Sequence, residues 1–173
     1  MLQDEANDLI RSSFEAVGRP QHWLDLGSGS GIFTYAIAGL LPMGSKVTAI
    51  DKADNSININ YRKGIEIKFI EGDFTNEIFD SQSVDGIFMA NALHYVKDQQ
   101  SFIKKLKARY PEMKKMVIIE YGSPVPNQWV PYPVPFSRLQ TFFEDLDVKN
   151  LRKIAERDSV YSKINMYVAE ISF

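Results

Sequence analysis

The sequence predicts an α/β fold in which a mostly parallel β-sheet is covered by helices on both faces. Short β-branched or aromatic runs recur along the 173-residue chain, and segments of helical or connecting character separate them. The composition is that of a globular protein, with 45% hydrophobic and 24% charged residues. Because parallel neighbours need a crossover and right-handed crossovers cover both faces, this alternation favours helices on both sides. We expect one domain over residues 1–173, since domains usually have roughly 100 to 200 residues.

The first expected element is an amphipathic helix within residues 1–18. Its apolar residues recur at steps of three and four, and Pro20 follows its end. These residues are Leu2, Ala6, Leu9, Ile10, Phe14 and Val17.

Five strand-like runs then alternate with helices or short connections. The runs are residues 22–26, 46–50, 65–70, 84–89 and 116–120. Residues 32–41 are apolar and end at Pro42, which predicts a helix there. Residues 99–109 predict another helix between the fourth and fifth strands.

The pattern changes after the fifth strand. Residues 121–136 are rich in proline and aromatic side chains, which predicts an ordered loop, and residues 137–146 predict a helix. Residues 148–155 and 164–173 predict two closing strands that form a hairpin. One face of the last strand is expected to carry Tyr167, Ala169, Ile171 and Phe173.

Composition excludes several classes of protein. The 20 Lys+Arg residues nearly balance the 22 Asp+Glu residues, for a net charge of −2, which disfavours a general nucleic-acid-binding surface. The absence of cysteine excludes disulfides, thiolate catalysis and Cys-ligated metals. The first ten residues lack a basic and apolar leader, and no apolar run approaches the roughly 20 residues that span a bilayer. We therefore expect a cytoplasmic protein that does not cross a membrane.

The most specific local signal is the glycine cluster W-L-D-L-G-S-G-S-G-I-F, residues 23–33. Its glycines, at 27, 29 and 31, lie where a buried strand must turn into a helix, and their lack of side chains lets a ligand approach the backbone. The helix N-terminus offers free N–H groups to a polar ligand. The dinucleotide fingerprint would require a third glycine at Ile32, which counts against a nicotinamide-dependent oxidoreductase, the alternative among enzymes.

The tight G-x-G-x-G spacing, with Asp25 two residues before it, resembles motif I of the class I S-adenosylmethionine-dependent methyltransferases. Later strand ends match the family in the correct order: Asp51 after V-T-A-I, Asp73 after F-I-E-G, and then A-N-A-L-H-Y-V. The matched motifs cover residues 23–96. The resemblance implies a Rossmann-like three-layer α/β/α sandwich. Its seven-stranded, mostly parallel sheet would have the order 3-2-1-4-5-7-6, with the last strand antiparallel.

By this resemblance the cofactor is S-adenosyl-L-methionine. Asp51 would bond both ribose hydroxyls, a task that suits a carboxylate because it accepts two hydrogen bonds at once. Asp73 would lie near the adenine amino group, with Phe74 beside the ring. The remaining candidate cofactor contacts are Asp25, Gly27, Ser28, Gly29, Gly31, Lys52 and Asn91.

The acceptor side of the site is expected between the segment after the fourth strand, the loop 121–136 and the helix 1–18, which would act as a lid. His94 and Tyr121 are the candidate catalytic residues, since a base is needed where the acceptor loses a proton. The candidate acceptor-binding residues are Tyr95, Trp129 and Tyr132. No metal site is expected.

These residues also have structural interpretations. An acid at a strand end often caps a turn, a lone histidine is often a hydrogen-bonded structural residue, and aromatic side chains beside prolines often plug a core.

The expected reaction is an in-line methyl transfer to a small-molecule acceptor, in which the protein mainly holds the reactants in position. The segment Asn91-Ala92-Leu93-His94 lacks the two prolines typical of enzymes that methylate amino groups of nucleobases, so that class is disfavoured. The alternatives are a non-catalytic S-adenosylmethionine-binding module or partner subunit, and an RNA methyltransferase that uses the basic run 104–115.

Overall fold

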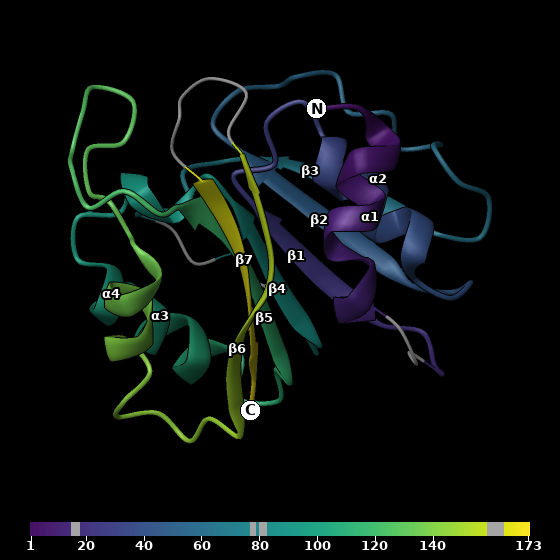
Figure 1. Ribbon diagram of the computed structural model, residues 1–173. Helices are drawn as coiled ribbons and strands as arrows, with labels where there is room; N and C mark the ends of the chain where they lie inside the picture. The colour runs from purple at the N-terminus through teal and green to yellow at the C-terminus, as the bar shows by residue number, and fades with distance from the viewer. Residues whose placement is uncertain (15–17, 77–78, 80–82, 159–164) are drawn as a thin grey trace.

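The computed structural model describes residues 1–14, 18–76, 79, 83–158 and 165–173. A seven-stranded sheet lies between two layers of helices, with α1 and α2 on one face and α3 and α4 on the other (Figure 1). The strand order is β3-β2-β1-β4-β5-β7-β6. The predicted fold class and sheet order, including the antiparallel last strand, are confirmed.

The first five strands pair in parallel, so their carboxyl ends meet at one edge of the sheet. They are β1 (His22–Leu26), β2 (Lys46–Asp51), β3 (Glu66–Glu71), β4 (Gly86–Ala90) and β5 (Lys115–Tyr121). β1 lies between β2 and β4. The chain therefore adds β2 and β3 on one side of β1, and then crosses back to add β4 and β5 on the other side. This is the topological switch point at which open α/β sheets bind ligands.

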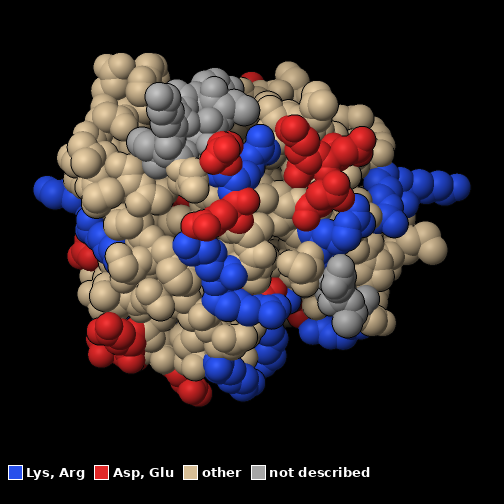
Figure 2. All heavy atoms as spheres, viewed as in Figure 1, with Lys and Arg blue, Asp and Glu red and all other residues tan. Residues whose placement is uncertain are grey.

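The terminal hairpin consists of β6 (Asn150–Asp158) and β7 (Asn165–Ser172), and β7 pairs antiparallel with both β5 and β6. The predicted alternation of the last strand is confirmed, because its two faces contribute to different cores. The edge strand β6 and the adjoining α1 carry charges of both signs (Figure 2). Charged side chains discourage the pairing of an exposed edge with another chain.

The helices are α1 (Gln3–Phe14), α2 (Ile32–Leu40), α3 (Gln99–Arg109) and α4 (Phe136–Thr141), with a short 3-10 turn η1 at Leu93–Tyr95. Among the described residues, none of the helices combines the length and apolar character needed to traverse a bilayer. Val17, which the sequence assigns to the first helix, lies outside the described residues.

The predicted helix 137–146 is wrong in length. α4 ends at Thr141, and the chain continues through turns whose N–H groups bond three residues back, as from Leu146 to Phe143. Glu144 and Asp145 would stand at the negative end of a longer helix, where acids are unfavourable.

The core on the α1/α2 face is organised around the indole of Trp23. This side chain is 1% exposed, and its ring centroid lies 4.6 Å from that of Phe14. Gly86, on the neighbouring strand, leaves room for the ring, since a Cβ there would lie 2.6 Å from the nearest indole carbon. Gly86 is therefore required by packing.

We predict that Gly86→Ala lowers the free energy of unfolding by about 1 to 3 kcal/mol, because the added methyl overpacks the Trp23 site. Gly39→Ala is the matched control, since a Cβ at this helical glycine meets nothing within 4 Å. That change should raise stability by up to about 1 kcal/mol through helix propensity. Urea unfolding monitored by Trp fluorescence measures both. Equal effects of the two substitutions would contradict the packing role of Gly86.

Candidate active site

The glycine turn between β1 and α2 is tied to the neighbouring strand by its backbone. The N–H groups of Gly27 and Ser28 donate to the carbonyl of Ile50 at 2.8 and 3.1 Å. Gly27 and Gly29 have φ values of 79° and 52°, in the left-handed region that favours glycine. A Cβ on Gly27 would lie 2.7 Å from the Ala92 Cβ, whereas one on Gly29 would meet nothing within 4 Å. The turn is closed by packing at Gly27 and faces open space at Gly29.

Asp51, at the end of β2, continues this connection through its side chain. Its Oδ2 accepts a hydrogen bond from the Gly29 N–H at 2.8 Å, and its Oδ1 accepts one from the Ala53 N–H at 3.1 Å. Each oxygen keeps a further lone pair. The carboxylate therefore orders the turn and still has the capacity to accept bonds from a ligand.

A cavity of about 550 Å³ lies over the ends of β1, β2 and β4. Ligand pockets in proteins commonly have volumes of roughly 300 to 1,000 Å³. Its walls contain six of the predicted cofactor contacts and one predicted acceptor contact. These residues are Gly27, Gly29, Asp51, Lys52, Phe74, Asn91 and Tyr95.

Two buried polar atoms at this end of the sheet lack partners among the described residues. They are Oδ1 of Asn91, a residue of the cavity lining, and Oγ of Ser28, in the glycine turn. Asn91 also has a left-handed backbone, with φ of 51°, held by a 2.8 Å bond from its N–H to the Ile119 carbonyl. Buried polar atoms without partners and strained backbone concentrate at binding sites. Both features fit a polar ligand in this cavity.

Asp25 is a buried carboxyl group with no cationic partner in the described part of the chain. Its side chain is 1% exposed and accepts a 2.6 Å bond from the Thr34 hydroxyl. Burial raises the pKa of Asp25 to about 7; the Thr34 bond lowers it in part, and the charge of Asp51 raises it further. A cationic ligand group beside Asp25 would favour the ionised carboxylate. Asp25 does not line the cavity itself.

Asp73 is occupied by neighbours of the turn after β3. Its carboxylate accepts bonds from the Thr75 N–H and hydroxyl at 3.0 and 2.6 Å, and Lys52 Nζ lies 3.0 Å away. Burial raises the pKa of Asp73, but the bonds from Thr75 and Lys52 outweigh it and lower the pKa to about 2. Asp73 is absent from the cavity lining, which suits the turn-capping interpretation. Its contact with adenine stays a prediction.

Gly31 is the N-cap of α2, with φ of 83°. A Cβ there would lie 3.2 Å from atoms of Tyr35 and Ile57, so this glycine is packed against the β2–β3 connection. Its predicted contact with the cofactor is not tested by this placement.

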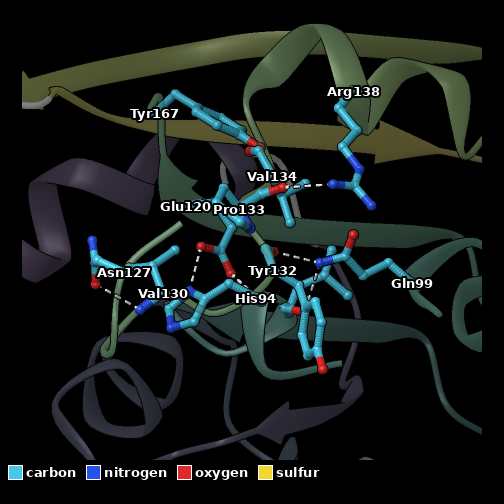
Figure 3. Close-up of polar contacts among 11 residues, drawn as sticks. His94, Gln99, Glu120, Asn127, Val130, Tyr132, Pro133, Val134, Arg138 and Tyr167 are labelled. Atoms are coloured by element: carbon cyan, nitrogen blue, oxygen red, sulfur yellow. Dashed lines mark hydrogen bonds and ion pairs between the residues drawn. The ribbon is translucent and has the colours of Figure 1, made fainter. Parts of the chain in front are cut away.

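His94 and Glu120 form a buried pair between η1 and the end of β5 (Figure 3). The His94 N–H donates to Glu120 Oε1 at 3.1 Å, and Nδ1 of the ring lies 2.7 Å from Oε2. The side chains are 2% and 1% exposed. Sequence reasoning missed Glu120, although it is the acid that closes the apolar run M-V-I-I-E. Its alternation with Met116 and Ile118 was the available signal that it faces the α3/α4 core.

The loop after β5 is pinned over this pair. The Tyr132 N–H donates to the His94 carbonyl at 3.1 Å, and Gln99 Nε2 donates to the carbonyls of Tyr132 and Leu93 at 2.7 and 3.3 Å. The Tyr167 hydroxyl bonds the Val134 carbonyl at 2.6 Å (Figure 3). The loop is therefore ordered, and Gln99 is a second residue that the sequence did not single out.

The acceptor-side residues are only partly brought together. Tyr132 lines a second cavity, of about 430 Å³, which shares Phe74, Thr75 and Tyr95 with the first. Trp129 is 71% exposed and lines neither cavity. Tyr121 also lines neither, but its ring centroid lies 6.1 Å from that of His94.

The helix α1 is largely a structural cover of the sheet. It buries Ala6, Ile10 and Phe14, and only its first turn approaches the site, where Gln3 Nε2 bonds the Ile32 carbonyl at 3.0 Å. The lid role of residues 1–18 stays a prediction.

The raised pKa of Asp25 predicts that stability falls as the pH rises from about 4 to about 7. In that window the folded protein keeps a proton that the unfolded chain, with a pKa near 3.8, has released. Asp25→Asn removes the proton linkage and should be more stable than the parent at pH 8, by roughly 4 kcal/mol at about 1.4 kcal/mol per pKa unit. Urea unfolding at pH 4 and pH 8 measures this difference.

Asp73→Asn is the control of opposite sign. In the parent protein, the lowered pKa of Asp73 means that its ionised carboxylate stabilises the fold above about pH 4. This contribution is lost as the pH falls towards 2. A stability difference between Asp25→Asn and the parent that is the same at pH 4 and pH 8 would contradict the assignment of Asp25.

Comparison with known proteins agrees with this geometry. A family model described as "Methyltransferase domain" matches residues 24–109, from β1 to the end of α3. A demethylmenaquinone methyltransferase of Renibacterium salmoninarum is 26% identical over 152 residues, which cover 87% of this chain. The chain spans only 58% of the length of that relative.

Solved structures share the whole fold. The YcgJ protein of Bacillus subtilis has a TM-score of 0.74 at 11% identity, with 98% of each chain covered. Magnesium protoporphyrin IX methyltransferase of Synechocystis, with bound S-adenosylmethionine, has a TM-score of 0.71 at 13% identity and covers 98% of this chain and 78% of its own. The sheet order, the glycine turn and the match to the methyltransferase-domain model over residues 24–109 agree with one another, and the chain has the fold of the class I S-adenosylmethionine-dependent methyltransferases.

Proposed function

We propose that this protein transfers the methyl group of S-adenosylmethionine to a small-molecule acceptor by in-line displacement. The observation that carries the proposal is the 550 Å³ cavity at the switch point of the sheet, whose lining brings together the glycine turn, Asp51 and Asn91. When bound, the cofactor supplies an electrophilic methyl group on a positively charged sulfur.

In this proposal the chain holds the cofactor along the ends of β1 and β2. Asp25 complements the positive charge at the amino-acid end of the cofactor. Because Asp25 is buried, the attraction between the two charges is stronger than it would be in water. The bare backbone at Gly29 lets the ligand lie against the turn. Asp51 accepts bonds from the ribose hydroxyls, and Phe74 gives an apolar wall for the adenine ring. The remaining predicted cofactor contacts are proposed to touch the same ligand. They are Gly27, Ser28, Gly31, Lys52, Asp73 and Asn91.

The acceptor half of the site is supported by less. Tyr95 lines both cavities, so an acceptor beside it would lie next to the cofactor. Two similar proteins are named as methyltransferases of demethylmenaquinone and of magnesium protoporphyrin IX, both small molecules. His94 and Tyr121 stay the proposed catalytic residues, and Tyr132 a proposed acceptor contact. Trp129 and a cytoplasmic location stay predictions.

Asp51→Ala should weaken cofactor binding by about 10- to 150-fold, the factor that corresponds to a net loss of about 1.5 to 3 kcal/mol of charge-assisted hydrogen bonding. Calorimetric titration with S-adenosylhomocysteine measures the affinity. Asp54→Ala is the matched control, since this nearby acid is exposed and lies outside the cavity lining. Unchanged affinity of Asp51→Ala in folded protein would contradict the ribose assignment.

Turnover is tested by the release of S-adenosylhomocysteine in the presence of lipid quinols, porphyrin carboxylates, phenols and amines. RNA is tested in the same assay. We expect product formation with one of the four small-molecule classes and none with RNA. Tight cofactor binding without turnover on the whole panel would favour the alternative, a non-catalytic binding module or partner subunit.

A further inference from the structure

We propose that Glu120 is a positioning residue, which fixes the tautomer of His94 so that Nε2 carries the lone pair of a general base. The assignment rests on the proposed methyl transfer and adds to it a residue outside both cavities. It also specifies the class of acceptor, one that loses a proton as it gains the methyl group.

The argument starts from the two oxygens of Glu120, which both bond to His94. Oε1 accepts the backbone N–H at 3.1 Å, and Oε2 lies 2.7 Å from the ring atom Nδ1. An ionised carboxylate only accepts hydrogen bonds, so Nδ1 must carry the proton in this pair. In the neutral imidazole the lone pair then lies on Nε2.

Both residues of the pair are held in place by the backbone that carries them. Glu120 projects from β5 and His94 from η1, and the Tyr132 N–H holds the His94 carbonyl at 3.1 Å. Rotation of the ring would break the 2.7 Å bond and leave a carboxylate that is 1% exposed with one oxygen unpaired. Such a loss costs more for a buried charged group than for a neutral one. The orientation of the imidazole is therefore set by the fold.

Nε2 is left available. It bonds to none of the described residues, and the His94 side chain as a whole is 2% exposed. The ring centroid lies 4.4 Å from that of Tyr95, which lines both cavities. His94 lines neither cavity itself, but its ring packs against Tyr95, one of the three residues that the two cavities share.

The charge of Glu120 has no cationic side chain against it in the described structure. Its other neighbours with titratable groups are phenols: Tyr121 beside the His94 ring, and Tyr167, whose pKa is raised by burial first and by the Glu120 carboxylate second. The imidazolium formed when Nε2 accepts a proton would be the counter-charge of this carboxylate. A buried charge pair of this kind is favourable only in good hydrogen-bond geometry, which the 2.7 Å contact provides.

The proposed step balances as follows. The acceptor gives its proton to Nε2 while its nucleophilic atom forms a bond to the methyl carbon. The bond from that carbon to sulfur breaks, and its electron pair stays on sulfur, which becomes a neutral thioether. Hydroxyl acceptors fit this step, because the methylated oxygen is neutral only once the proton has left.

Nitrogen-15 NMR of the imidazoles tests the tautomer without acceptor or turnover. The chain has two histidines, so His22 serves as an internal reference. We expect Nδ1 of His94 to be protonated and Nε2 unprotonated. In Glu120→Gln the amide oxygen can still accept the backbone N–H, while the amide N–H donates to Nδ1 and moves the ring proton to Nε2. With the hydroxyl acceptor identified by turnover, kcat should fall at least 100-fold and KM should change less than threefold.

Glu170→Gln is the matched control. Glu170 is a carboxylate that is 4% exposed and paired with Lys115 and Arg152. Its replacement by Gln should leave the His94 spectrum and kcat unchanged. Protonation of His94 on Nε2 in the parent protein would overturn the proposal, even if Glu120→Gln fails to fold. So would a Glu120→Gln variant that keeps the parent tautomer, or one that inverts it with kcat unchanged. Failure of the parent to bind S-adenosylmethionine would instead reject the proposed function, since the spectrum needs no cofactor.

Discussion

The hydrogen bond from the Gly29 N–H to Asp51, together with the bonds of Gly27 and Ser28 to the Ile50 carbonyl, fixes the glycine turn to the end of β2. Packing of Gly27 against Ala92 and Phe74 holds the same turn from the other side. With these contacts, a bare backbone segment and a carboxylate meet at the switch point beside β1, between its neighbours β2 and β4. The cavity, its polar lining and the start of α2 all follow from that junction.

The same junction leaves unfavourable groups in the free protein. Asp25 is buried beside another carboxylate and has only the Thr34 hydroxyl to stabilise its charge, and Asn91 has a left-handed backbone and an unpartnered amide oxygen. None of these choices helps the fold by itself. Proteins retain such local costs at functional sites, where a ligand offsets them. The arrangement fits a ligand that carries positive charge and several hydrogen-bonding groups.

Sequence reasoning predicted the parts of the molecule that depend on local chemistry. The α/β class follows from the alternation of elements, whereas the sheet order came from the family resemblance. The position of Asp51 follows from its place at the end of the second strand. The predictions were weaker where the outcome depends on contacts across the fold. Glu120 meets His94 only because β4 and β5 are neighbours, and the acids after Thr141 shorten α4.

Other residues show the same limit. Asp73 has the spacing of a ligand, yet its carboxylate is occupied by Thr75 and Lys52, which no spacing rule reveals. Trp129 has the composition of a binding residue, but the turn at Asn127 presents it to solvent. A loop with aromatic side chains therefore predicts order more reliably than it predicts which side chain faces a ligand.

The most direct test of the account is the proton balance of cofactor binding near pH 7, measured by calorimetry in buffers of different ionisation enthalpy. If a cationic group settles beside Asp25, the parent should release a fraction of a proton that Asp25→Asn does not release, because binding shifts the pKa of Asp25 down from about 7. The comparison cancels the titration of the ligand itself. Equal proton release by the two proteins would contradict the central claim, which is that a positively charged group of the cofactor binds beside this buried carboxyl group and lowers its pKa.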